Sequence, residues 1–270
     1  MKRFGLIGHP VAGSFSPKLF EAAYGGRYPY DLLEGAEFGA SWQRFLDEYD
    51  GINITAPFKQ DAFRAVDALS DDARLCGAVN LAVKTPAGIV GYNTDVAGVV
   101  LAVREALAAR DTQPVIPGLT GNPLQEALVV GCGGAGRAAA VAALRLGCRV
   151  TLANRTPSRA AALADDLNAR LSPIGTPAST DSPACTWVPV EDLDTLSPDL
   201  VIYTVPGPMD GFPEFPEAIV LEANYRTPCL KGCGRTYISG LRWLLFQAVA
   251  GYKIFTGESP DADAMFRIFC

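Results

Sequence analysis

Short apolar runs alternate with amphipathic stretches along the N-terminal part of the chain. Strands are predicted at residues 3–8, 30–35, 51–55, 78–85 and 88–93, with helices at 16–24, 41–49 and 61–68 between them. Ser16 is expected to cap the first helix, with Pro17 at its first position, and residues 86–88 are expected to form a turn. This succession of strands and helices predicts an α/β domain.

A second α/β pattern begins near residue 126. A helix predicted at 97–109 precedes it, followed by a stretch at 110–124 that we interpret as a linker or surface excursion. The pattern itself consists of a strand at 127–130, a helix at 135–146 ended by Gly147, and a strand at 148–154. Residues 178–189 are expected to form a loop. The segments 240–257 and 261–269 have the periodicity of amphipathic helices, which alone leaves open the domain that they cover.

Composition narrows the class of protein. The 270 residues are 49% hydrophobic, enough for two packed cores. A net charge of −6 argues against a nucleic-acid or anionic membrane partner, because both need a basic surface. The N-terminus has no apolar run long enough for a signal peptide, so a cytoplasmic location is expected.

Cysteine and histidine usage limits the chemistry. Seven cysteines are scattered through the chain, which favours reduced thiols over a disulfide framework. Cys229 and Cys233 lack a second pair, and the single histidine, His9, lies in a loop-like setting, so no metal site is expected. A proton carrier in this protein is therefore not expected to be histidine.

A glycine-rich turn follows the strand at 127–130. Gly131 would make the tight turn, Gly133 would let the backbone approach a diphosphate, and Gly136 would allow the following helix to pack closely. Because the motif stands between a predicted strand and a predicted helix, it indicates a dinucleotide site.

The end of the next strand bears on the choice of cofactor. An NAD site would carry an acidic residue there, whereas this chain has Asn154, Arg155, Thr156 and Arg159. Two guanidinium groups and a hydroxyl suit the 2′-phosphate of NADP, and the alternative is that these arginines only cover a solvated loop.

Polar residues interrupt the apolar framework at 53–59 and again at 93–95. Alone, the first stretch predicts a polar strand end, held by Asn53, with a solvated lysine. With a nicotinamide cofactor nearby, carbonyl reduction needs a proton for the developing alkoxide, and Lys59 oriented by Asp95 could supply it. We therefore expect these two side chains within reach of a hydrogen bond or one bridging water.

Seven segments together resemble the shikimate dehydrogenases over nearly the whole chain. They are GLIGHPVAGSFSP at 5–17, GINITAPFK at 51–59, GAVN at 77–80, GYNTDVAG at 91–98, GCGGAGRAA at 131–139, NRTPSR at 154–159 and GLRWLLFQA at 240–248. The resemblance implies reversible, NADPH-dependent reduction of 3-dehydroshikimate to shikimate in aromatic amino acid biosynthesis.

The resemblance also implies an architecture and a set of site residues. Residues 1–105 and 238–270 would form an α/β domain that binds shikimate, with the C-terminal helices returning to it, and 106–237 an NADP-binding Rossmann-type domain with a doubly wound parallel sheet. Lys59 and Asp95 would be catalytic. The substrate would be held by Ser14, Ser16, Thr55, Asn80, Tyr225 and Gln247. The cofactor would be held by Gly131, Gly133, Gly134, Ala135, Gly136, Asn154, Arg155, Thr156, Arg159, Thr204 and Gly240.

The chain also departs from the family pattern. Gly13 and Leu81 replace a common histidine and threonine, and the segments 201–208, 221–224 and 243–244 are atypical. The last three concern the nicotinamide end of the cofactor site and the domain cleft. Two alternatives therefore stay open: a quinate and shikimate dehydrogenase with broader cofactor use, and a non-catalytic sensor. The expected assembly is a monomer or homodimer.

Overall fold

The computed structural model describes residues 1–111, 124–172 and 183–269. The chain divides into two compact units, Met1–Gly98 with Leu244–Cys270 and Val99–Trp243. These boundaries differ by a few residues from the 105/106 and 237/238 expected from the sequence. Most of the excursion expected at 110–124 lies outside the described residues.

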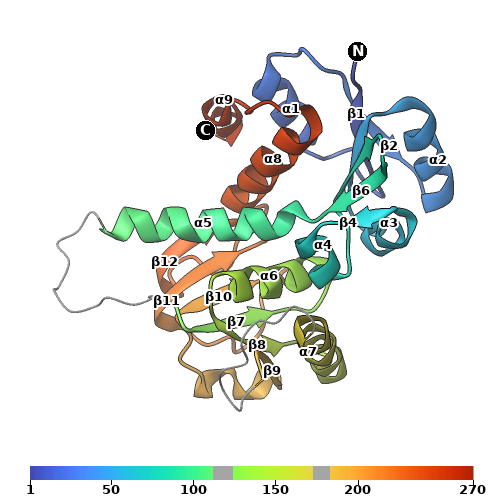
Figure 1. Ribbon diagram of the computed structural model, residues 1–270. Helices are drawn as coiled ribbons and strands as arrows, with labels where there is room; N and C mark the ends of the chain where they lie inside the picture. Colours follow the sequence, from blue (N-terminus) through green and yellow to red (C-terminus); the bar gives the residue numbers. More distant parts are fainter. Residues whose placement is uncertain (112–123, 173–182, 270) are drawn as a thin grey trace. The chain divides into compact units, whose positions relative to one another are not determined.

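The first unit is built on a six-stranded mixed sheet (Figure 1). Its strands are β1 (Phe4–Gly8), β2 (Tyr30–Glu34), β3 (Gly51–Ile54), β4 (Ala68–Leu69), β5 (Leu81–Thr85) and β6 (Gly88–Tyr92), in the order β2-β1-β3-β5-β6-β4. The pairs of β1 with β2 and β3 are parallel, whereas β5 is antiparallel to both neighbours. The expected turn at 86–88 makes the β5–β6 hairpin. Because β1 and β3 are parallel, their carboxyl ends lie at the same end of the sheet.

Helices pack on this sheet. They are α1 (Ser16–Tyr24), α2 (Phe38–Glu48), α3 (Lys59–Ala65), α4 (Asp71–Cys76), the start of α5 (Thr94–Asp111), most of α8 (Gly240–Thr256) and α9 (Ala262–Phe266), followed by a 3₁₀ turn, η3 (Arg267–Phe269). Helices α1, α2 and α3 correspond to the helices predicted at 16–24, 41–49 and 61–68, whereas β4 and α4 were not predicted. The cap expected for α1 is wrong, because Phe15 occupies that position and Ser16 is the first helical residue. The Ser16 hydroxyl is engaged by Ser14 instead.

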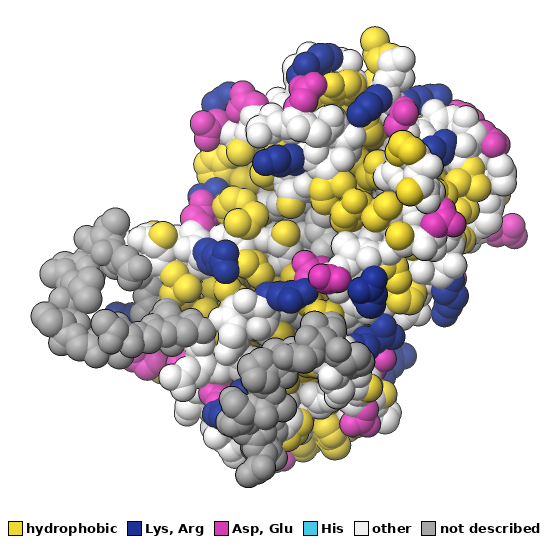
Figure 2. Space-filling model, viewed as in Figure 1, with side chains coloured by type: hydrophobic (Ala, Val, Ile, Leu, Met, Phe, Trp, Pro, Cys, Tyr) yellow, Lys and Arg dark blue, Asp and Glu magenta, His cyan; other side chains and the backbone are white. Residues whose placement is uncertain are grey.

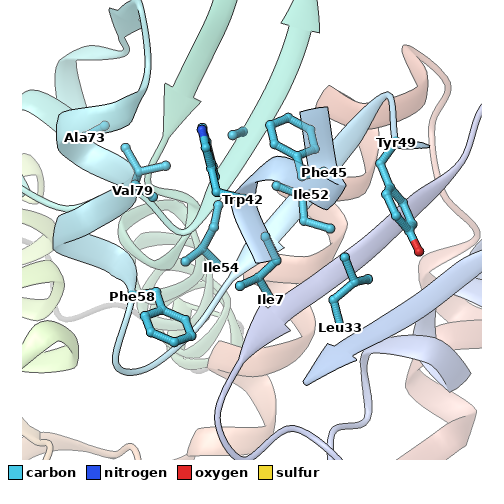
Figure 3. Close-up of a cluster of buried hydrophobic side chains, with 12 residues drawn as sticks. Ile7, Leu33, Trp42, Phe45, Tyr49, Ile52, Ile54, Phe58, Ala73 and Val79 are labelled. Carbon is cyan, nitrogen blue, oxygen red and sulfur yellow. The ribbon is translucent and has the colours of Figure 1, made fainter. Parts of the chain in front are cut away.

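Two buried clusters pack on the first sheet. One joins α2 to the strands through Trp42, Phe45, Ile52 and Ile54, as Figure 3 shows. The other joins α1 to α8 and α9, and its buried side chains include Phe4, Phe20, Leu245, Tyr252, Phe255 and Met265. The apolar face of α8 is thus covered by the N-terminal strand and helix, which periodicity alone left open.

The second unit has a parallel six-stranded sheet. Its strands are β7 (Glu126–Val130), β8 (Arg149–Ala153), β9 (Cys185–Val188), β10 (Leu200–Tyr203), β11 (Phe215–Glu222) and β12 (Gly234–Ser239), in the order β12-β11-β10-β7-β8-β9. Helices α6 (Gly134–Arg145) and α7 (Pro157–Leu171) connect β7 to β8 and β8 to β9, and η2 (Val190–Thr195) precedes β10. The strand order reverses between β7 and β10, as in doubly wound dinucleotide-binding sheets.

The loop expected at 178–189 is wrong in its second half, because Cys185–Val188 forms the edge strand β9. Asn168 of α7 fixes this short strand, since its side chain donates to the Cys185 carbonyl at 2.8 Å and accepts from the Cys185 amide at 3.0 Å. Residues 178–182 lie outside the described residues. A four-residue run beside prolines carries too little periodicity to reveal such a strand.

The described residues were compared with the requirements of a metal site and of a membrane-spanning helix. Within residues 1–111, 124–172 and 183–269, no three His, Cys, Asp or Glu side chains are grouped to hold a metal ion. No helix in these segments has the length and apolarity to cross a bilayer. On the face seen in Figure 2, Lys and Arg side chains are interspersed with Asp and Glu.

Candidate active site

Lys59 and Asp95 form an ion pair in the first unit, with 2.6 Å between Lys59 Nζ and Asp95 Oδ2. Lys59 is the first residue of α3, and Asp95 lies in the first turn of α5. A turn in which the Phe58 amide donates to the Thr55 carbonyl at 3.0 Å leads the chain from β3 into α3. The proximity predicted from the sequence is confirmed.

The electrostatics of this pair follow from its place in the fold. Asp95 is favoured at the N-terminus of α5 by the helix dipole, whereas Lys59 at the start of α3 is not, so the carboxylate offsets an unfavourable position for the ammonium. The side chains are 21% and 15% exposed, which weakens solvent screening. A partly exposed ammonium held by a carboxylate can donate a proton to an oxygen that gains negative charge.

Three hydroxyl side chains, those of Ser14, Ser16 and Thr55, lie in the segments that follow β1 and β3. The Ser14 hydroxyl donates to Ser16 Oγ at 3.1 Å, and the Ser16 amide donates to Ser14 Oγ at 3.2 Å. The Thr55 amide donates to the Ile7 carbonyl at 2.9 Å, and a Cβ at Gly8 would clash with the Thr55 methyl group. Ser14 and Ser16 thus hold each other between β1 and α1, and Thr55 follows β3, the strand paired with β1.

Asn80 and Gln247 are joined by a residue that our sequence interpretation missed, Thr94. The Thr94 amide donates to Asn80 Oδ1 at 2.8 Å, Asn80 Nδ2 donates to Thr94 Oγ1 at 3.1 Å, and Thr94 Oγ1 lies 3.3 Å from Gln247 Oε1. Asn80 is 4% exposed and Thr94 is 3% exposed. Its position between Asn93 and Asp95 in the 91–98 motif could have indicated that Thr94 belongs to the site.

Two further asparagines hold this group in place. Asn53 Oδ1 accepts from the Tyr30 hydroxyl at 2.8 Å, and its Nδ2 donates to the Asn80 carbonyl at 3.4 Å. Asn93 Nδ2 donates to the Ala78 carbonyl at 3.0 Å, whereas the buried Asn93 Oδ1 has no hydrogen-bond partner among the described residues. Asn53 and Asn93 thus fix the backbone on both sides of Asn80.

The glycine turn of the second unit follows β7 at the point where the strand order reverses. Gly131 has a φ of +98°, which a residue with a side chain rarely adopts. A Cβ at Gly136 would clash with the Gly131 carbonyl oxygen, so α6 packs directly on the turn. No described atom beyond its chain neighbours lies within 4 Å of the place a Cβ would take at Gly133.

Helix α6 begins at Gly134 and Ala135 with no acidic residue in its first turn. Its free backbone amides and its dipole favour an anion in the space beside Gly133. Thr204, at the end of β10, supports the turn by donating from Oγ1 to the Val130 carbonyl at 2.9 Å. These features fit a dinucleotide diphosphate.

The arginine-bearing segment lies after β8, beside the glycine turn. Asn154 Oδ1 accepts from the Cys132 amide at 3.3 Å, and Asn154 Nδ2 donates to the Thr156 carbonyl at 3.0 Å. Burial raises the pKa of the Cys132 thiol to about 11, against the opposing positive charges of Arg137 and Arg159. Arg155 and Arg159 are exposed, so their guanidinium groups are available to a phosphate.

The last two assigned residues belong to the second unit as well. A Cβ at Gly240 would clash with the Ala223 carbonyl oxygen, so a glycine is needed where α8 begins beside β11. Tyr225 lies in the segment after β11. Its role in binding the substrate stays a prediction.

Comparison with known proteins agrees with this arrangement. Residues 6–82 match the family model described as the shikimate dehydrogenase substrate binding domain. The shikimate dehydrogenase (NADP(+)) of Halorubrum lacusprofundi is 36% identical over 299 residues, which cover 98% of this chain and 97% of that protein.

Solved structures extend the likeness to the whole fold. The shikimate 5-dehydrogenase of Thermus thermophilus in complex with NADP(H) and shikimate has a TM-score of 0.78 and 28% identity, over 99% of this chain and 98% of that chain. The quinate dehydrogenase of Corynebacterium glutamicum in complex with NAD has a TM-score of 0.81 and 27% identity, with the same coverage. The chain belongs to the shikimate dehydrogenase family.

Proposed function

We propose that this protein is an NADP-dependent shikimate dehydrogenase, which reversibly reduces 3-dehydroshikimate to shikimate in aromatic amino acid biosynthesis. The observation that carries the proposal is the Lys59–Asp95 ion pair at 2.6 Å, in the same unit as the hydroxyl and amide side chains assigned to the substrate. Membership of the family, and a glycine turn flanked by Arg155 and Arg159, support NADP as the cofactor.

The proposal assigns a task to each part of the chain. Residues 1–105 and 238–270 bind the substrate, and 106–237 bind NADP. Ser14, Ser16 and Thr55 hold the substrate carboxylate with hydroxyl donors. Asn80 and Gln247, linked through Thr94, hold the ring hydroxyls. Tyr225 is proposed to approach the carboxylate.

The chemistry at the carbonyl divides between cofactor and protein. NADPH supplies the hydride that reduces the carbonyl carbon. The Lys59 ammonium stabilises the negative charge that develops on the carbonyl oxygen and gives that oxygen a proton from Nζ. Asp95 holds the ammonium in position through the ion pair before the transfer. In the direction of oxidation, Lys59 Nζ takes the proton back.

The glycine turn yields a paired prediction. Gly136→Ala forces a Cβ onto the Gly131 carbonyl, so it should destabilise the free protein by about 1–3 kcal/mol. Gly133→Ala meets open space, so it should leave the free protein stable and weaken NADP binding by filling the space of the diphosphate. Thermal unfolding with and without NADP⁺ measures both effects. If NADP⁺ raised the unfolding temperature of Gly133→Ala as much as that of the wild type, the diphosphate would not bind beside Gly133.

A second candidate function is a quinate and shikimate dehydrogenase that also uses NAD, supported by the likeness to the quinate dehydrogenase of Corynebacterium glutamicum. Rates with shikimate or quinate, each with NADP⁺ or NAD⁺, distinguish the two. We expect the highest kcat/KM with shikimate and NADP⁺. A higher value with quinate and NAD⁺ would favour the second candidate.

The cellular location and the partners of the protein are proposed from composition alone. The odd number of scattered cysteines supports a reducing compartment such as the cytoplasm. The net charge of −6 supports a small-molecule substrate and no nucleic-acid partner. We propose a monomer or homodimer, which sedimentation of the purified protein would distinguish.

A further inference from the structure

A fully buried carboxylate, Glu222, ends strand β11 in the second unit. Its Oε1 accepts from the Cys229 amide at 2.8 Å and from Cys229 Sγ at 3.2 Å. Its Oε2 accepts from the Leu230 amide at 3.1 Å and from the Tyr237 hydroxyl at 2.9 Å. Four donors therefore converge on one side chain, and together they tie the end of β11 to β12 and to residues 223–230, here called the β11 loop.

The donors around Glu222 are uncharged and stay protonated at neutral pH. Burial, followed by the bond to Glu222, raises the pKa of the Cys229 thiol to about 11, and burial likewise raises that of Tyr237. A buried carboxylate with four donors can remain in the interior, whereas the loss of one oxygen acceptor would leave two buried or part-buried donors without a partner. The geometry of the β11 loop thus depends on both oxygens.

The β11 loop is connected to the glycine turn through a second loop. Asn224 Nδ2 donates to the Pro206 carbonyl at 2.8 Å, and Asn224 Oδ1 accepts from the Thr227 amide at 3.2 Å. Thr204, two residues before Pro206, bonds the Val130 carbonyl next to Gly131. All these segments leave the carboxyl ends of β7, β10 and β11, the edge at which doubly wound sheets bind ligands.

We propose that Glu222 is a positioning residue for the cofactor. Through the β11 loop and Asn224, it fixes the segment around Pro206, which follows β10 beside the glycine turn, and thereby determines the affinity for NADP⁺. The inference rests on the proposed function, since it takes NADP⁺ as the ligand of this edge. It also gives the atypical segments 201–208 and 221–224 a role, because they carry both ends of the Asn224–Pro206 bond.

Three variants test this role by calorimetric titration with NADP⁺ and with shikimate. Glu222→Gln removes one acceptor oxygen, and Asn224→Ala cuts the bond to Pro206 at a residue that is not fully buried. Glu126→Gln is the matched control. Glu126 accepts from the exposed Arg149 at the amino end of β7, away from the carboxyl ends where the glycine turn lies. Amide hydrogen exchange at Cys229 and Leu230 measures, without any ligand, whether their bonds to Glu222 are intact.

We expect Glu222→Gln and Asn224→Ala to raise the Kd for NADP⁺ by about tenfold, the effect of one or two lost hydrogen bonds. Shikimate affinity should not change, and the two amides should exchange faster in Glu222→Gln. Wild-type NADP⁺ affinity in Asn224→Ala, or an equal loss in the Glu126→Gln control, would overturn the inference. Failure of the wild type to bind NADP⁺ would overturn the proposed function and this inference with it.

Discussion

Replacement of Lys59 by alanine is expected to lower kcat for shikimate oxidation by about 10²- to 10⁴-fold, the usual contribution of a positioned acid or base. The KM for shikimate should change much less, because the hydroxyl and amide side chains proposed to hold the substrate remain. The physical reason is the loss of the Lys59 ammonium, held 2.6 Å from Asp95 and proposed to meet the carbonyl oxygen. Steady-state kinetics with saturating NADP⁺ measures both constants.

Two variants control this result. Lys84→Ala removes another lysine of the first unit, which donates to the Leu46 carbonyl, and should leave kcat unchanged. Asp95→Asn keeps the size of the side chain but removes its charge, so kcat should fall less than in Lys59→Ala. Equal turnover by the wild type and Lys59→Ala would remove Lys59 from the mechanism and leave the activity itself intact.

Loss of the two exposed arginines after β8 should change the choice of cofactor. We expect Arg155→Ala with Arg159→Ala to raise the KM for NADP⁺ by about 100-fold, or about tenfold for each charge-assisted bond to the 2′-phosphate. The KM for NAD⁺, which lacks this phosphate, should not rise. Initial rates with each cofactor at saturating shikimate provide the comparison.

Arg235→Ala is the control for this double variant. Arg235 is an exposed arginine on β12 that faces Glu217 at 3.8 Å, so its loss removes a positive charge of the same unit without touching the glycine turn. Its KM for NADP⁺ should match that of the wild type. If the double variant also kept this KM, the two arginines would only cover a solvated loop.

Local patterns predicted much of the fold, because they depend on near neighbours in the chain. Gly131 and Gly136 stood between a strand and a helix, and the structure places them where a side chain would be strained or would clash. Strand β9 was missed because a side chain from another element, Asn168, fixes it. The cap of α1 was misplaced because the Ser16 hydroxyl bonds Ser14 instead.

The candidate site could be predicted only in part, because its members come from distant segments. Lys59 and Asp95 were paired by chemical need, and their distance confirms the pairing. Thr94 was missed because its partners, Asn80 beside β5 and Gln247 on α8, come from distant segments of the chain. Glu222 stood in the atypical segment 221–224, but its role could not be predicted, since its four donors come from residues 229, 230 and 237.

The most direct test of the account is the reduction of NADP⁺ by purified wild-type protein in the presence of shikimate. We predict that NADPH accumulates only when shikimate is added, at a rate proportional to protein concentration, with one 3-dehydroshikimate formed for each NADPH. If the protein bound both shikimate and NADP⁺ but formed no NADPH, it would be a binding protein without turnover, and the central claim would be wrong.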